Sequence, residues 1–171
     1  MIQKKPRIVI GVDPGTVITG YGLIREEGNT LTAVDYGCIR PPRAMPLTDR
    51  YYAIFSCLKD IIERYSPDAL AVETQYVDKN VQSALKLGMA RGVVIIAAKS
   101  FGIPVFEYSP SRAKSAVTGN GRASKEQIQG MIQRLLNLKA PPEPEDAADA
   151  LAIALCHIHN AKSLDIAATA I

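Results

Sequence analysis

Four acidic residues stand at places where the chain can hold them close together. Asp13 ends a β-branched run that starts at Arg7, and Glu73 ends a second apolar run. Both runs have the composition of buried central strands. Asp146 and Asp149 are three residues apart in a predicted helix and enclose two alanines, so they lie on one face that can pack closely on a sheet.

Carboxylates gathered at one point repel each other and raise their own pKa values unless a cation lies among them. Oxygen-only ligands favour Mg²⁺ or Mn²⁺, and four shared carboxylates suit two ions roughly 3.5–4 Å apart that clamp an in-line phosphoryl displacement. Taken singly, the acids also fit a turn, a strand end and a helix N-terminus. Taken together, Asp13, Glu73, Asp146 and Asp149 are the predicted catalytic and metal-binding residues.

The elements that must position these acids can be located from apolar periodicity and from turn residues. Strands are expected at residues 7–13, 17–25, 31–40, 68–73 and 104–108, and helices at 47–65, 80–101, from Ser124 onward and at 145–160. Ser124 and Gln127 have the spacing of a capping box. A strand meander followed by alternating helices and strands predicts an α/β fold with a mixed sheet.

Length and composition predict one domain over residues 1–171, because 47% hydrophobic residues suffice for one core and no shift in composition divides the chain. Residues 1–6 and about 163–171 match no motif and are expected to be disordered tails. Three scattered cysteines favour a reducing compartment. No uninterrupted apolar run approaches the roughly 20 residues of a membrane span. We therefore expect a soluble, cytoplasmic protein without a membrane partner.

A basic segment over residues 109–125 predicts contact with phosphate groups. It contains Arg112, Lys114, Arg122 and Lys125 and no acidic residue. Because the net charge of the whole chain is only +3, this local concentration carries more information than the total. A solvated basic loop is the alternative interpretation.

The predicted helix over residues 80–101 is apolar on nearly all sides between Ala84 and Ala98. Ala84, Gly88 and Gly92 place small residues at every fourth position, where another backbone can approach closely. Such a helix is buried either within its own domain or at a twofold dimer interface. The sequence leaves both possibilities open.

Four blocks of the sequence together resemble the RuvC family of Holliday junction resolvases. They are IGVDPGTVITGYG, AVETQYVDKN followed by SALKLGMARG, PVFEYSPSRAKSAVTGNGRASK, and EDAADALAIA, in the order found in the family. The resemblance spans roughly residues 7–160. It implies an RNase H-like fold, with a five-stranded mixed sheet flanked by helices. It also implies a homodimer that nicks two strands of like polarity in four-way DNA junctions.

The resemblance also assigns expected roles to single residues. Asp13, Glu73, Asp146 and Asp149 match the family's catalytic acids, which implies Mg²⁺ as cofactor, two ions per subunit, with Mn²⁺ as a substitute. Lys114 and Lys125 match lysines that the family uses near DNA, and Tyr76 stands where the family usually has a stacking phenylalanine. The expected DNA-binding residues are Tyr76, Lys79, Asn80, Lys86, Arg112, Lys114, Arg122 and Lys125. The branch-migration proteins RuvA and RuvB are implied partners.

Three other functions fit parts of the sequence. Asp-x-Gly-Thr before a hairpin also resembles the phosphate loop of actin-like and Hsp70-like ATPases, although 171 residues supply only one of the two lobes that close around a nucleotide. An RNase H-like nuclease acting on RNA would use similar acids with a different basic surface. A junction-binding module without catalysis is disfavoured by the complete set of acids.

Overall fold

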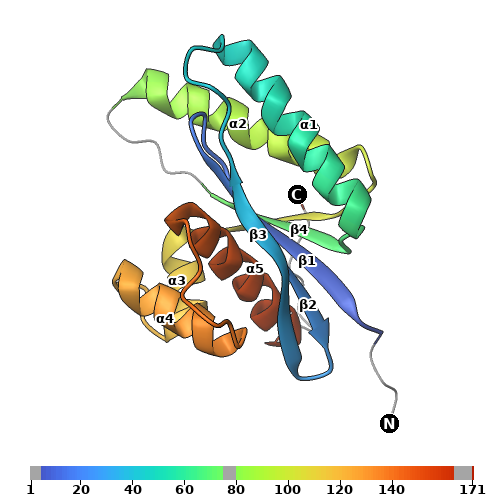
Figure 1. The fold of residues 1–171 in the computed structure, drawn as a ribbon, viewed down its shortest axis with the longest axis vertical. Coiled ribbons are helices and arrows are strands. Elements are labelled where there is room, and N and C mark those ends of the chain that lie inside the picture. Colours follow the sequence, from blue (N-terminus) through green and yellow to red (C-terminus); the bar gives the residue numbers. More distant parts are fainter. Residues whose placement is uncertain (1–4, 75–79, 164–170) are drawn as a thin grey trace.

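The centre of the fold is a mixed sheet of five strands. They are β1 (Arg7–Asp13), β2 (Thr19–Glu27), β3 (Thr30–Ile39), β4 (Ala69–Glu73) and β5 (Val105–Tyr108). Their order across the sheet is β3-β2-β1-β4-β5 (Figure 1). The first three strands pair antiparallel, whereas β1, β4 and β5 run parallel. The structure is a computed structural model and describes residues 5–74, 80–163 and 171.

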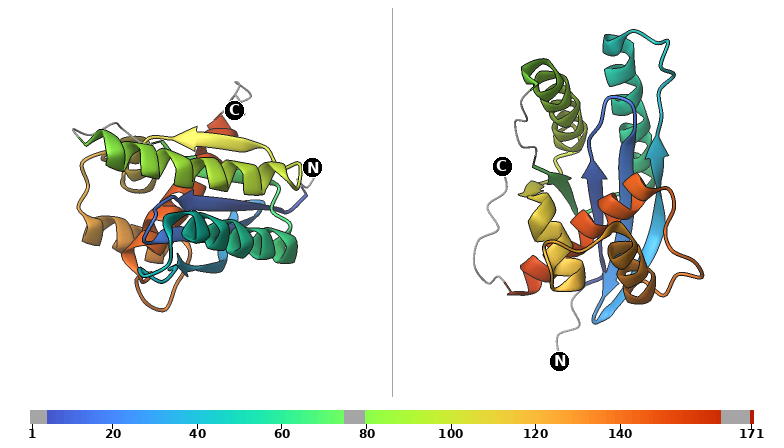
Figure 2. Two further views of the ribbon diagram at one scale, coloured as in Figure 1. Left: turned by 90° about the horizontal axis from the view of Figure 1, so that it is seen from above. Right: turned by 90° about the vertical axis from the view of Figure 1, so that its left-hand side faces the viewer.

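The described residues also form helices on both faces of this sheet. These are α1 (Leu47–Tyr65), α2 (Val81–Lys99), α3 (Pro110–Thr118), α4 (Lys125–Leu135) and α5 (Glu145–Ser163). In Figure 2, α1 and α2 lie side by side on one face, and α5 crosses the other. The predicted fold class, a five-stranded mixed sheet flanked by helices, is confirmed.

Helix α3 was not predicted, because residues 109–125 have the sequence of a basic segment leading into the next helix. The Ser109 side chain accepts a hydrogen bond from the Arg112 backbone N–H at the start of α3, and Gly119 ends the helix with a φ of 75°. Only Ala113 and Val117 are buried within its nine residues. Two buried positions are too few to show the apolar periodicity of a helix in the sequence.

Two hydrophobic clusters fill the space between the sheet and its two helical layers. Residues of β1 alternate between them: Val9 belongs to the cluster under α3, α4 and α5, whereas Ile10 and Val12 belong to the cluster under α1 and α2. Helix α5 is buried almost without interruption from Ala147 to Ile158. It is therefore a core element, and its position fixes the position of the acids at its N-terminus.

Glycines allow the backbone of α5 to lie directly on the sheet. A Cβ atom at Gly11 would be 2.0 Å from the Ala150 carbonyl oxygen, and one at Gly20 would be 2.0 Å from the Asp146 carbonyl oxygen. A Cβ at Gly22 would be 2.7 Å from the side chain of Leu151. No larger residue fits at these positions without moving the helix away from β1 and β2.

Helix α2 is buried on one side only. Ala90, Val94, Ala97 and Ala98 are buried against the rest of the domain. The opposite side carries exposed apolar side chains, and Cβ atoms at Gly88 and Gly92 would meet nothing within 4 Å. The described part of the chain therefore does not cover the small-residue stripe, and for that side one of the two interpretations of this helix, burial within its own domain, is wrong.

By length and composition alone, α2 is also long and apolar enough to cross a membrane. Its packing argues against that role. The Tyr51 hydroxyl of α1 donates a hydrogen bond to the Lys86 carbonyl at 3.0 Å, and Arg91 forms an ion pair with Glu107 of β5. The tails expected at residues 1–6 and 163–171 lie mostly outside the described residues. The assignment of residues 1–171 to a single domain stays a prediction.

Replacing Gly11 by alanine should lower the free energy of unfolding by about 2–4 kcal/mol, because the new methyl group collides with the α5 backbone. Urea unfolding followed by circular dichroism measures the change. Gly130→Ala is the matched control, since nothing lies within 4 Å of a Cβ there and alanine favours the α4 helix by about 0.5–1 kcal/mol. Equal stability of the two variants would contradict the close contact between α5 and the sheet.

Candidate active site

Two of the four acids end neighbouring parallel strands at the centre of the sheet. Val12 of β1 pairs with Val72 of β4, so the last residues of these two strands, Asp13 and Glu73, lie at the same edge of the sheet. Successive side chains of a strand point to opposite faces of the sheet. Because Val12 and Val72 belong to the cluster on the face away from α5, the side chains of Asp13 and Glu73 point toward α5. The structure thus brings the two acids close enough that the charge of Glu73 is, after burial, the largest cause of the raised pKa of Asp13.

The other two acids reach this edge through the glycine contacts. Gly20 is the residue of β2 that pairs with Asp13, and the Asp146 carbonyl lies directly over Gly20. Asp146 and Asp149 stand in the first two turns of α5. Both carboxylates contribute to the electrostatic potential at Asp13. The charges of all four predicted acids, from β1, β4 and α5, therefore interact at this edge of the sheet.

Burial and mutual repulsion disfavour the charged form of this cluster. Burial, followed by the charges of Glu73 and Asp149, raises the pKa of Asp13 to about 8. Burial is also the largest cause of the raised pKa values of Glu73 and Asp149. Asp13 therefore retains a proton near neutral pH, and a bound cation would reduce the repulsion among the ionised carboxylates.

The donor set fits a hard divalent cation, because carboxylate oxygens are the ligands that Mg²⁺ and Mn²⁺ prefer. Within residues 5–74, 80–163 and 171, no three His, Cys, Asp or Glu side chains converge tightly enough to hold a metal ion as they stand. Cation binding would therefore require the carboxylates to lose bound protons and to draw closer together.

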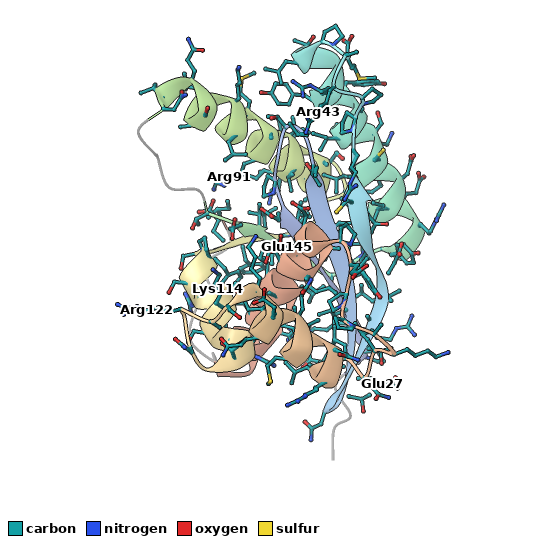
Figure 3. The ribbon with its side chains drawn as sticks, turned by 60° about the vertical axis from the view of Figure 1, so that its left-hand side comes forward. Glu27, Arg43, Arg91, Lys114, Arg122 and Glu145 are labelled. Carbon is teal, nitrogen blue, oxygen red and sulfur yellow. The ribbon has the colours of Figure 1, made fainter. Side chains whose placement is uncertain are left out.

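Two lysines flank the acids. Lys114 of α3 lowers the pKa values of Glu73 and Asp149 through its charge, which partly offsets the effect of burial. Lys125, the first residue of α4, acts on Asp149 in the same way. Figure 3 shows Lys114 on α3 and Glu145 at the start of α5. Both lysines that the sequence singled out therefore lie next to the acids.

The remaining expected DNA-binding residues are more widely distributed. Arg112 donates a hydrogen bond to the Asn160 side chain at 2.6 Å and lies over the Tyr108 ring, so it links α3 to α5 and β5. Arg122 points away from the fold in Figure 3. Asn80 caps α2 by accepting from the Ser83 backbone N–H, and Lys86 is exposed on α2. Tyr76 and Lys79 lie outside the described residues.

Sequence reasoning missed Glu145, which forms an ion pair with Lys125, and Arg40, which follows β3 and lines a cavity of about 830 Å³ beside the start of α5. Neither residue had a distinctive signal. Glu145 looks like an ordinary acid in the first turn of a helix, where it interacts favourably with the helix dipole. Its contact with Lys125 depends on how α4 packs against α5, and no local pattern reveals that.

Two central strands end in carboxylates, and acids on a helix that crosses the sheet lie close to them. This arrangement defines a nuclease site of the RNase H-like class. Comparison with known proteins then identifies the family. The family model described as crossover junction endodeoxyribonuclease RuvC matches residues 9–157. A protein of that name from Protochlamydia amoebophila is 63% identical over 150 residues, covering 88% of this chain and 89% of the relative. The chain belongs to the RuvC family of crossover junction endodeoxyribonucleases.

Solved structures agree with this assignment. Thermus thermophilus RuvC in complex with a Holliday junction substrate has a TM-score of 0.86 and 34% identity, with coverage of 92% of this chain and 96% of the other. The yeast mitochondrial Holliday junction resolvase Ydc2 has a TM-score of 0.62 at 15% identity and supports the fold alone. The family match assigns the chain to the DNA junction nucleases and not to the ATPase or RNA-directed alternatives.

The raised pKa of Asp13 predicts that the metal-free protein loses stability as the pH rises from about 4 to about 8. Over this range the folded state retains a proton that the unfolded state, with an aspartate pKa of 3.8, has lost. Each pKa unit between the two states corresponds to about 1.4 kcal/mol. Urea unfolding in EDTA at several pH values should show this slope, and Asp13→Asn should remove most of it.

Asp60→Asn, on the exposed side of α1, is the control and should retain the slope. Mg²⁺ should increase stability more at pH 8 than at pH 5, because protons compete with the cation at low pH. A slope that survives in the Asp13→Asn variant would show that Asp13 is not the group that binds the proton.

Proposed function

We propose that this protein resolves four-way DNA junctions by nicking two strands of like polarity, with Asp13, Glu73, Asp146 and Asp149 as its catalytic residues. The convergence of these acids at one sheet edge, between two lysines, is the observation that carries the proposal. Family membership supplies the reaction class, phosphodiester hydrolysis in DNA. The close similarity to a RuvC solved with a Holliday junction substrate supports the substrate.

RuvC-family nucleases are metal-dependent, and the four acids are the groups of this chain that would hold the metal. We expect two Mg²⁺ ions per subunit, with Mn²⁺ as a substitute, because four carboxylates can neutralise two divalent charges. When bound, such ions activate the attacking water and stabilise the charge on the leaving oxygen. The protein contributes a rigid frame, since Asp13 and Glu73 end core strands and the other two acids stand on a buried helix.

The two flanking lysines suit the phosphate backbone of the substrate. Lys114 and Lys125 approach the acids from α3 and α4, so a strand crossing the site passes between positive charges. They stabilise the negative charge that develops on the phosphate during attack. Arg122, Asn80 and Lys86 extend the basic and polar surface, and Arg112 contributes chiefly by holding α3 in place.

Tyr76 and Lys79 retain their proposed roles in stacking and phosphate contact by resemblance to the family. RuvA and RuvB are proposed partners on the same ground. A function on chromosomal DNA and three cysteines without a predicted pairing support a cytoplasmic location.

A homodimer would place two active sites on one junction, which matches the approximate twofold symmetry of a four-way junction. The exposed side of α2 is the candidate interface. Its stripe comprises Val81, Leu85, Gly88, Met89, Gly92 and Ile96, which recur at helical spacing. The side chains of Leu85 and Ile96 are 64% and 62% exposed, and contiguous exposed apolar side chains of this kind mark interaction surfaces. The two glycines allow a second helix to approach closely.

Asp13→Asn should reduce junction cleavage by about 10²-fold or more while leaving junction binding within a few fold of the wild type, because the change removes a metal ligand and not a phosphate contact. End-labelled junction, linear duplex and an RNA–DNA hybrid, each with and without Mg²⁺, are resolved on a denaturing gel. Paired, ligatable nicks in the junction alone support the proposal. Cleavage that persists in the variant would refute the assignment of the metal site.

The double substitution Leu85→Glu and Met89→Glu should weaken the dimer at least about tenfold, because it places charges in the apolar stripe of α2. Analytical ultracentrifugation gives the dissociation constant. Tyr52→Glu is the control, since Tyr52 is 71% exposed on α1 and lies off the stripe. An unchanged sedimentation profile in the double variant would exclude this face as the interface.

A further inference from the structure

Glu145, the first residue of α5, lies beside the proposed active site without being one of its proposed metal ligands. Its Oε1 atom is 2.6 Å from the Nζ atom of Lys125. Both side chains remain partly exposed, at 43% for Glu145 and 64% for Lys125. A DNA phosphate that approaches Lys125 therefore meets an ammonium group that already has an anionic partner.

The backbones on both sides of this ion pair are held in place. Lys125 begins α4 directly after Ser124, whose side chain accepts a hydrogen bond from the Gln127 backbone N–H while the Gln127 side chain accepts from the Ser124 N–H. Glu145 begins α5, whose backbone lies on the glycines of β1 and β2. Exchange of partners at Lys125 thus requires only side-chain rotation.

There is room for the Glu145 side chain to move. Lys125 and Glu145 both line the cavity of about 830 Å³ beside the start of α5. Arg40 and Gln129 line the same cavity and offer hydrogen-bond donors to a carboxylate. A displaced Glu145 side chain can accordingly find new partners without leaving the protein surface.

The position of the pair also explains its electrostatic role. The hydrogen bond to Glu145 is the largest cause of the raised pKa of Lys125, and the charges of Asp149 and Asp146 act in the same direction. The ion pair therefore holds Lys125 at the edge of the acid cluster. A phosphate oxygen at the same distance would supply an equivalent partner.

We infer that Glu145 acts as an intramolecular stand-in for a DNA phosphate: it holds Lys125 beside the active site in the free protein and is displaced when the DNA backbone arrives. Glu145 is thus a positioning residue that competes with the substrate. This inference rests on the proposed function, because it requires that Lys125 contacts DNA. It implies that every bound DNA must break one ion pair, which lowers affinity.

The test is a double-mutant cycle with Glu145→Gln and Lys125→Met. Junction affinity is measured without divalent metal, so that no cleavage occurs. Glu145→Gln should tighten binding by about two- to fivefold, the range that corresponds to an exposed ion pair, and Lys125→Met should abolish most of this gain. Glu126→Gln is the matched control: Glu126 is adjacent to Lys125 and lines the same cavity, but among the described residues Lys125 forms its ion pair with Glu145 and not with Glu126.

The controls separate this inference from simpler explanations. An equal gain from Glu145→Gln with and without Lys125 would show a general effect of negative charge and would overturn the inference. Weaker binding by the Glu145→Gln variant would also overturn it, because Glu145 would then be assisting Lys125. If Glu126→Gln tightened junction binding as much as Glu145→Gln does, and if that gain also depended on Lys125, the inference would be overturned, because Glu145 would have no special role.

A second measurement does not depend on DNA binding. The rate at which an amine-acylating reagent modifies Lys125, followed by peptide mass spectrometry, should rise about two- to fivefold in the Glu145→Gln variant as the ion pair is lost. An unchanged rate would overturn the inference even if the protein resolves junctions. A raised rate in a protein that shows no preference for junctions over duplex would instead locate the failure in the proposed function.

Discussion

The contact between the α5 backbone and the glycines of β1 and β2 is the constraint on which the site depends. Side chains normally separate a helix from the sheet on which it packs. Here Gly11, Gly20 and Gly22 remove those side chains on the sheet, and the alanines of α5 remove them on the helix. The first turns of α5 consequently descend to the level of the strand ends. Asp146 and Asp149 can then share one electrostatic environment with Asp13 and Glu73.

This geometry brings together charges that destabilise the metal-free protein. Burial and repulsion raise the pKa values of three of the acids, and Lys114 and Lys125 offset only part of the effect. The apolar residues that strands and helices bury on both sides of the sheet offset this loss of stability. A cluster that is unfavourable alone becomes favourable when cations bind, so the same repulsion that costs stability provides affinity for metal.

The two helical layers have different tasks. Helices α3, α4 and α5 form the side of the molecule that carries the lysines and half of the acids. Helices α1 and α2 support the opposite face of the sheet, and α2 uses only one side for this purpose. The ion pair between Arg91 and Glu107 fixes α2 to β5, which leaves its other side open to a partner. The fold therefore separates the chemistry from the proposed dimer contact by the thickness of the sheet.

The sequence by itself determined the strands, most of the helices and the family, because these depend on local periodicity and on residues that stand together in short blocks. It also singled out Asp13, Glu73, Asp146 and Asp149 as the candidate catalytic acids. It also indicated that α5 packs closely, through the alanines between Asp146 and Asp149. Only the tertiary structure decided which glycines make that approach possible, that the stripe on α2 is open, and that Glu145 meets Lys125. Each of these is a contact between residues distant in sequence, so no local pattern encodes it. Helix α3 was missed for a related reason: its nine residues are held chiefly by packing against α5 and by the bond from Arg112 to Asn160.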